Sequence, residues 1–152
     1  MAVFTKRPFK LDAGIVELDN WIILELQNKV NMYNKSDFAT ELKNRTKKFA
    51  IESIRHFRKL PKTDEARIIG KQFLRSSTSV AANYRAVCRA RSEAEFYSKL
   101  CIVVEEIDET VLWLEIMDES DISKPETLYE EAVELMKIMS VSKSKVATKI
   151  KK

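Results

Sequence analysis

The sequence predicts an all-α protein, an antiparallel up-down-up-down four-helix bundle. Hydrophobic residues make up 45% of the 152 residues and charged residues 33%, with only two Gly and three Pro, which favours long helices over a turn-rich β fold. Apolar residues recur at steps of three and four in four long segments, the spacing of a buried helix face. Short connections near Pro61, Ala90 and Asp121 favour antiparallel neighbours within one compact bundle.

The chain divides into three predicted regions. Residues 1–35 form a leader, residues 36–140 the bundle, and residues 141–152 a Lys-rich C-terminal extension whose low apolar density gives no reason to expect order. The leader favours a fifth, amphipathic helix, although its run WIILEL is also compatible with a short strand. The apolar line of this candidate helix is Ile15, Leu18, Ile22, Leu26 and Val30.

The first bundle helix is expected over residues 37–59. Ser36 or Asp37 can cap its N-terminus, and Pro61 stops it. Residues that recur at steps of three and four predict its buried face: Phe38, Leu42, Thr46, Phe49, Ser53, Phe57 and Leu60.

The second helix is expected to begin near Thr63 or Asp64 and to continue to about Arg89. Its packing faces mix bulky and small side chains, and small side chains let a partner helix approach closely. The residues predicted to form helix packing or an oligomer interface are Ser76, Ser77, Thr78, Ala81, Ala82, Asn83 and Tyr84. At Asn83, a buried side chain that fixes helix register is favoured over a ligand-binding one.

A further line on this helix is cationic. Lys71, Arg75, Arg85 and Arg89 share one narrow side with Thr78 and Ala82, at alternating steps of four and three. Together with Arg91, these four cations are named the basic stripe. Because clustered cations attract phosphate, the sequence predicts nucleic-acid binding by the basic stripe, namely by Lys71, Arg75, Arg85, Arg89 and Arg91.

The third and fourth helices have clear start signals. Ser92 and Glu95 form a capping box that opens a helix reaching about Glu119, and Pro125 stands where a first helical turn accepts proline. The apolar face of the third helix is Phe96, Leu100, Val103, Ile107, Thr110, Leu114 and Met117. The corresponding line of the fourth is Leu128, Ala132, Leu135 and Met139.

Charge is strongly segregated along the chain. Residues 1–91 carry 19 Lys or Arg against 9 Asp or Glu, residues 92–139 carry 3 against 14, and the last thirteen residues add five Lys, which gives the net charge of +4. This asymmetry suggests packing of acidic on basic surfaces within or between subunits, with basic surface left for an anionic partner. Solvated helix faces are an equally weighted interpretation of any one cluster.

Enzymatic activity is the least supported class of function. His56 is the only histidine and has no nucleophile placed beside it, so boundary packing is favoured. Carboxylate-bridged metal sites in bundles use Glu-x-x-His pairs, which one histidine cannot supply, and no phosphate-binding glycine loop is present. The sequence therefore indicates no catalytic residues, no metal and no cofactor.

The cysteines and the apolar runs bear on location. Cys88 and Cys101 have neither metal-ligand nor disulfide spacing, which favours a reducing cytoplasm, and burial is the expected fate of the Cys88 thiol. No apolar run approaches the roughly 20 residues of a transmembrane helix, and no membrane partner is expected.

The combination RS-x-TS-V-AAN followed by R-x-S-x-x-EF resembles the small four-helix proteins first noted in intervening sequences of large-subunit ribosomal RNA genes. The resemblance covers about Phe38 to Met139 and departs from the commonest pattern after Asn83, where an Ala-Glu-Gly turn is replaced by residues 84–89. The matching residues are Leu74, Arg75, Ser76, Thr78, Ser79, Val80, Ala81, Ala82, Asn83, Arg91, Ser92, Glu95, Phe96, Leu100, Glu105, Glu109, Trp113 and Leu114.

The resemblance implies a closed ring of four-helix subunits, with a homopentamer favoured and no established enzymatic activity. A related branch is similar to the accessory variability proteins of diversity-generating retroelements, basic oligomers that associate with a reverse transcriptase and nucleic acid. Two functions follow as hypotheses. One is an accessory factor that binds RNA or DNA, or a ribonucleoprotein, through the basic stripe. The other is a self-assembling scaffold in which the stripe pairs with Glu105, Asp108 or Glu109 of a neighbour.

Overall fold

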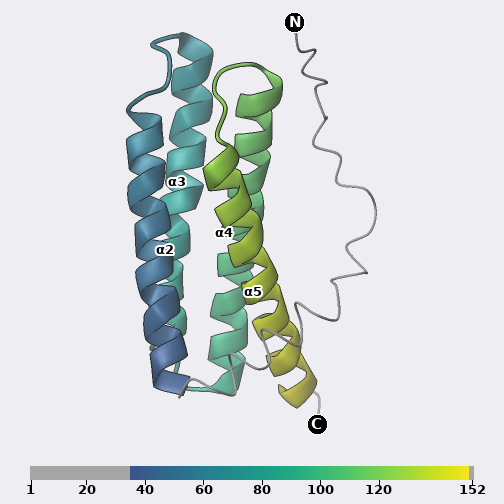
Figure 1. Ribbon diagram of the computed structural model, residues 1–152. Helices are drawn as coiled ribbons and strands as arrows, with labels where there is room; N and C mark the ends of the chain where they lie inside the picture. Colours follow the sequence, from purple (N-terminus) through teal and green to yellow (C-terminus); the bar gives the residue numbers. More distant parts are fainter. Residues whose placement is uncertain (1–34, 151–152) are drawn as a thin grey trace, which may run out of the picture.

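The computed structural model describes residues 35–150, which form an all-α four-helix bundle with antiparallel neighbours (Figure 1). Within this range there is no strand. The helices are α2 (Lys35–Phe57), α3 (Asp64–Val87), α4 (Glu93–Glu119) and α5 (Glu126–Ile150). The predicted fifth helix of the leader lies outside the described residues. No described helix is long and apolar enough to span a membrane.

The predicted helix starts at Thr63 and Ser92 are confirmed. The Thr63 side chain accepts a hydrogen bond from the Ala66 backbone N–H, and Ser92 Oγ accepts one from the Glu95 N–H at 3.1 Å. The return bond of the capping box differs from the prediction, because Glu95 Oε2 accepts from the Arg91 N–H at 2.8 Å. The carboxylate thus reaches one residue further back along the chain than Ser92.

Helix α5 continues well past Ser140, so most of the Lys-rich extension is helical. Ser142 Oγ donates to the Ile138 carbonyl at 2.9 Å, and Val141 and Val146 are half-buried. These contacts provide the packing that the sparse apolar pattern did not predict. As a result, Lys145 and Lys149 lie on the last turns of α5.

The core follows the predicted apolar lines of α2, α4 and α5, and α3 adds its own buried side chains. In α2, Leu42 and Phe49 are buried, and Thr46 and Ser53 on the same side of the helix are fully buried. The two hydroxyls donate to the carbonyls of Leu42 and Phe49 at 2.8 and 2.9 Å, so their burial leaves no unsatisfied donor. The buried apolar residues of the other helices are Ala66, Phe73, Val80, Tyr84, Val87, Leu100, Val103, Ile107, Val111, Leu114, Met117, Leu128, Ala132, Leu135, Ile138 and Met139.

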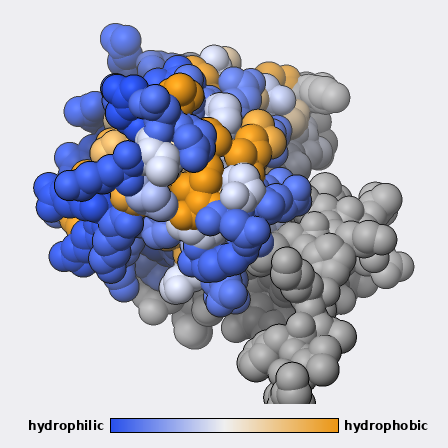
Figure 2. Space-filling view, turned by 90° about the horizontal axis from the view of Figure 1, so that it is seen from above, coloured by the Kyte–Doolittle hydropathy of each residue, from blue (hydrophilic) through white to orange (hydrophobic). Residues whose placement is uncertain are grey.

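One end of the bundle carries the α2–α3 and α4–α5 connections. Seen from this end, hydrophilic residues surround a smaller apolar area (Figure 2). Asp121 adopts a left-handed φ of 56°, a conformation that Asp tolerates, and Lys124 Nζ lies 3.0 Å from its carboxylate. At Gly70, an added Cβ would lie 2.6 Å from Leu60 Cδ1, so the absence of a side chain permits this close packing.

Candidate nucleic-acid interface

Helix α3 and the connection that follows it present the basic stripe to solvent. Its cations are all exposed: Lys71, Arg75, Arg85, Arg89 and Arg91. Within the described part of the chain, Lys71, Arg85 and Arg89 have no carboxylate within ion-pair distance. All five side chains are thus open to solvent, and Arg75 and Arg91 differ from the rest by having carboxylate partners.

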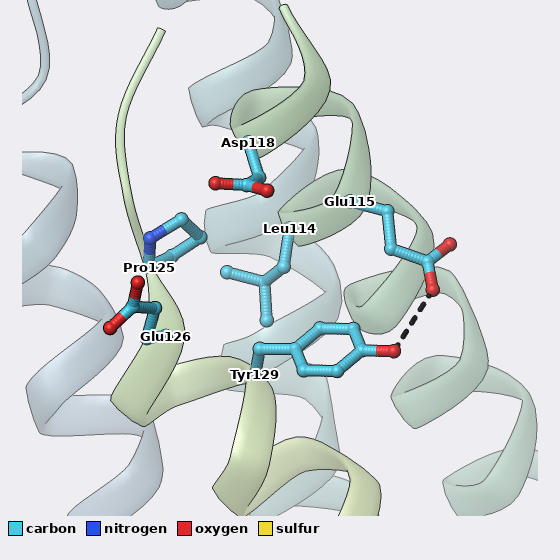
Figure 3. A pocket seen from close by; sticks show the side chains of 6 residues that line it. All are labelled: Leu114, Glu115, Asp118, Pro125, Glu126 and Tyr129. Carbon is cyan, nitrogen blue, oxygen red and sulfur yellow. Dashed lines mark hydrogen bonds between the residues drawn. The ribbon is translucent and has the colours of Figure 1, made fainter. Parts of the chain in front are cut away.

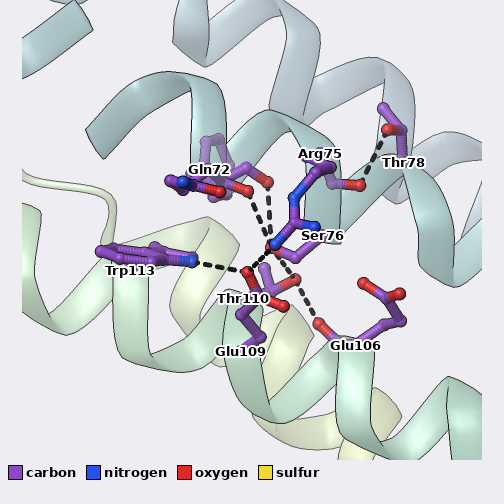
Figure 4. Close-up of polar contacts among 9 residues, drawn as sticks. Gln72, Arg75, Ser76, Thr78, Glu106, Glu109, Thr110 and Trp113 are labelled. Carbon is purple, nitrogen blue, oxygen red and sulfur yellow. Dashed lines mark hydrogen bonds and ion pairs between the residues drawn. The ribbon is translucent and has the colours of Figure 1, made fainter. Parts of the chain in front are cut away.

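Arg75 is the member of the stripe that pairs with the acidic helix. Its Nη2 lies 2.7 Å from Glu109 Oε1 on α4, and Trp113 Nε1 donates to the same oxygen at 3.1 Å (Figure 4). The Arg75 side chain is 65% exposed and that of Glu109 is 31% exposed, so water screens the pair only in part. The charge of Arg75 is therefore countered inside a single subunit.

Below this ion pair, α3 and α4 meet through two fully buried hydroxyl groups. Ser76 Oγ and Thr110 Oγ1 lie 3.0 Å apart. Each hydroxyl is also within hydrogen-bond distance of a carbonyl of its own helix, that of Phe73 for Ser76 and that of Glu106 for Thr110. Small side chains with internally satisfied hydroxyls let the two helices approach closely.

The acidic surface of α4 lies beside this contact. Burial, then the neighbouring Glu109, raises the pKa of Glu106, while Arg75 acts in the opposite direction. Glu105 and Asp108 are exposed, and no described cation pairs with either of them. Glu105, Glu106, Asp108 and Glu109 together form an acidic cluster on α4, of which Glu105 and Asp108 are solvated and Glu109 is the one member with an ion pair in the described chain. No group of three or more His, Cys, Asp or Glu residues in the described chain could hold a metal ion.

The residues predicted to form helix packing or an oligomer interface differ in how deeply they are buried. Ser76, Ser77 and Tyr84 are buried inside the subunit, and burial together with Cys88 raises the pKa of the Tyr84 hydroxyl. Thr78, Ala81 and Asn83 are half-buried, and Ala82 is exposed. Asn83 is not the deeply buried residue expected from the sequence, and its amide has no hydrogen bond to any described residue.

Cys88 is exposed, so its expected burial is wrong. Helix α3 ends at Val87, and Cys88 is its C-cap, with the backbone N–H bonded to the Tyr84 carbonyl at 3.1 Å. The helix runs past Asn83, where this chain departs from the family's commonest pattern, but stops two residues short of Arg89. Tyr84, one turn earlier on the same side of the helix, is still buried, whereas Cys88 lies beyond the last helical residue and its thiol is at the surface.

Helices α3 and α5 terminate at the same end of the bundle (Figure 1), and cations lie in or just after their last turns. Arg91, Lys145 and Lys149 line one groove there. Arg91 is 91% exposed and lies 3.7 Å from Glu95, a weak contact. We call this group the basic end, and its members are Arg85, Arg89, Arg91, Lys145 and Lys149.

Two polar contacts elsewhere were not predicted from the sequence. Arg45 of α2 bonds Glu131 of α5 through Nε at 2.7 Å and Nη2 at 2.9 Å, and also contacts Glu134 at 2.8 Å. Chiefly the Glu131 hydrogen bond raises the pKa of Arg45, against an opposing effect of burial. His56 lies 3.0 Å from Ser123 Oγ and edge-on to Phe73, and burial, then Lys59, lowers its pKa.

A second depression, between α4 and α5, is too small for a ligand. It measures about 10 Å³, roughly the space of one water. Its wall includes Leu114 and Pro125, and Tyr129 donates a hydrogen bond to Glu115 at 3.2 Å (Figure 3). We therefore assign it no role.

Residues 39–141 match the family described as 23S rRNA-intervening sequence protein. The matched range spans nearly all of α2, the whole of α3 and α4, and most of α5. Among solved structures, the chain is similar to a protein of unknown function from the S23 ribosomal protein family of Bacteroides thetaiotaomicron. The TM-score is 0.62 and the sequence identity 29%, over 66% of this chain and 96% of that chain. No curated protein matches the chain.

Proposed function

The chain belongs to the family of 23S rRNA-intervening sequence proteins, and we propose that it is a non-enzymatic oligomeric accessory factor that binds nucleic acid or a ribonucleoprotein. The observation that carries the proposal is the basic end. Arg85 of α3 and Arg89 just after it have no carboxylate partner in the described chain, and Arg91 lines one groove together with Lys145 and Lys149 of α5.

The arrangement supports contacts with phosphate rather than with base edges. Arg85 and Arg89 lie at the C-terminal end of α3, and Lys145 and Lys149 at that of α5, where the negative end of the helix dipole stabilises cations. The surface contains no protruding helix or β-ribbon in the described range that would fill a major groove. Binding is therefore expected to be weakly sequence-selective and strongly salt-dependent, since release of counterions drives it.

Assembly would multiply this surface, and we propose a ring, with a pentamer favoured on the family resemblance. Support comes from large apolar side chains left exposed on α3 and α4: Ile68 is 60% exposed, Leu112 49% and Ile102 41%. Large apolar side chains that stay exposed on neighbouring helices are a common feature of surfaces that contact another subunit. In a ring, the basic ends of several subunits would present their cations to one nucleic-acid strand.

A self-assembling scaffold without a nucleic-acid role is the second candidate. Its support is that Glu105 and Asp108 of α4 are exposed without a described cation partner. Arg85 of α3 and Arg89 just after it are likewise exposed without a described carboxylate partner. Copies of the chain could pair these opposite charges. Arg75 does not contribute to this candidate, because it pairs with Glu109 of its own subunit.

Two measurements separate the candidates. Fluorescence titration with labelled RNA, DNA and hybrid duplex tests binding, and absence of binding at about 50 mM salt rules out the first candidate, because several phosphate contacts are strongest there. Multi-angle light scattering tests assembly, and a monomer at micromolar concentration would remove the ring from both candidates. For the proposed partner enzyme, a neighbouring reverse transcriptase gene would favour the retroelement relation, and a position inside a ribosomal RNA gene would oppose it.

A further inference from the structure

A long apolar groove opens at the end of the bundle where α2 and α4 begin and α3 and α5 end. Its volume is about 1030 Å³. All four helices contribute apolar side chains to it, among them Phe38, Tyr84, Phe96, Met139 and Val146. A groove of this size with few convergent polar groups suits an apolar chain segment better than a small polar ligand, whose recognition needs several fixed polar contacts.

Charged side chains also line the groove. Arg91 of the α3–α4 connection and Lys145 and Lys149 of α5 line it, against Glu93 as the one lining carboxylate among the described residues. The apolar lining favours an occupant with an apolar face, and the excess of cations favours an occupant with a net negative charge.

The leader of the same chain has these two properties. Between residues 15 and 30, apolar residues recur at helical steps, and the charged residues are Glu17, Asp19 and Glu25 against the single Lys29. Helix α2 starts at Lys35, and Phe38 and Ala39 line the groove just after it. The segment is thus joined to the rim by about five residues, a reach of roughly 17 Å when extended.

We propose that residues 15–30 dock in this groove of their own subunit as an amphipathic segment, with Leu18, Ile22 and Leu26 against the apolar lining. The lengths agree. The part of α5 that lines the groove runs from Ile138 to Lys149, about 17 Å of helix, and Leu18 to Val30 would span about 18 Å as a helix. Because a short tether gives a high effective concentration, docking within one chain competes well with docking between chains. The proposal does not depend on nucleic-acid binding.

Cys88 provides a direct test, because its exposed thiol lines the groove. In full-length protein with Cys101→Ser, we would introduce Leu18→Cys, Ile22→Cys or Leu26→Cys singly, and oxidise each with copper phenanthroline. Gln27→Cys is the matched control, since position 27 lies on the other face from Ile22 in either a helix or a strand. The expected result is an intramolecular Cys88 disulfide that forms roughly tenfold faster for at least one of the three than for the control.

Equal rates for all four positions would overturn docking of the apolar face. A disulfide-linked dimer in place of the intramolecular product would overturn docking within one subunit, and would assign the groove to the leader of a second copy.

Fluorescence offers a second test that needs no added thiol. In Trp113→Phe protein, Trp21 is the only tryptophan and reports on the leader. Val146→Asp places a charge in the groove at a half-buried position near the end of α5, and Ser144→Asp is the control on the same helix outside the lining. We expect a red shift of Trp21 emission and greater acrylamide quenching with Val146→Asp alone. Identical spectra for the two variants would contradict the proposal.

Discussion

Arg75 and Glu109 form an ion pair that joins α3 to α4, with Nη2 and Oε1 2.7 Å apart, and the Trp113 indole N–H holds the same carboxylate oxygen. This contact divides the basic stripe. Arg75 is held by its own subunit, whereas Arg85 and Arg89, nearer the C-terminal end of α3, have no described carboxylate partner. The two parts of the stripe are therefore expected to contribute unequally to binding.

Arg89→Gln is predicted to weaken RNA binding more than Arg75→Gln. Loss of one phosphate contact lowers the slope of log affinity against log salt by about 0.7 to 0.9, and this loss is expected for Arg89 but not for the neutralised Arg75. Fluorescence anisotropy at several salt concentrations measures both slopes. Glu109→Gln is the matched control and should strengthen binding, because it removes a negative charge and releases Arg75. Equal losses of RNA affinity for the two arginine variants would show that the Arg75–Glu109 ion pair does not affect binding.

Ser76→Leu is predicted to destabilise the bundle by about 1–3 kcal/mol. The Ser76 side chain is fully buried opposite Thr110, and a larger side chain there must push α3 away from α4. Urea unfolding followed by circular dichroism gives the change in the free energy of unfolding. Ser98→Leu, on the exposed surface of α4, should change it by less than about 0.5 kcal/mol. A similar small effect at both positions would refute the close contact.

Arg45→Lys is predicted to lower the free energy of unfolding by about 1 kcal/mol. A lysine cannot reproduce the two parallel bonds from one guanidinium to Glu131 that connect α2 with α5. Chemical denaturation at low and at high salt measures the effect, which should shrink as salt rises. The comparison variant is Arg55→Lys, whose exposed contact with Glu52 lies within one helix, and no measurable loss is expected there.

His56→Gln is predicted to flatten the pH dependence of stability near neutrality. Burial, then Lys59, lowers the pKa of His56 in the folded protein, so the unfolded chain binds more protons once the pH falls below about 6.5. The free energy of unfolding of the natural protein should therefore fall between about pH 7.5 and about pH 5.5. Urea unfolding across this range measures it, and parallel curves for the two proteins would contradict the prediction.

Much of the fold could be predicted because helix periodicity and start signals are local. The line through Leu42, Thr46, Phe49 and Ser53 is buried as expected, and the starts at Thr63 and Ser92 are fixed by cap hydrogen bonds that involve residues at most four apart. The end of α5 could not be predicted from helix periodicity or from a local stop signal. Its last turns are held by half-buried residues such as Val146, and a low apolar density does not reveal such packing.

The pairing of side chains between helices could not be predicted. Arg45 and Glu131 are 86 positions apart, and Arg75 and Glu109 are 34 apart, so their contact depends on the axial register of packed helices. The sequence placed Arg75 on a cationic line and Glu109 in an acidic cluster without indicating which cation meets which carboxylate. The exposure of Cys88 depends similarly on where α3 ends against its neighbours.

The salt dependence of RNA binding by a triple variant tests the proposed function most directly. Arg85→Gln, Arg89→Gln and Arg91→Gln together remove three cations of the basic end. Lys47→Gln, Lys48→Gln and Arg58→Gln remove three exposed cations in or just after α2 as the matched control. Binding through the basic end predicts that the first variant lowers the slope of log affinity against log salt by about 2 to 3, and that the control leaves it unchanged. Equal slopes for the natural protein and the first variant would contradict the account.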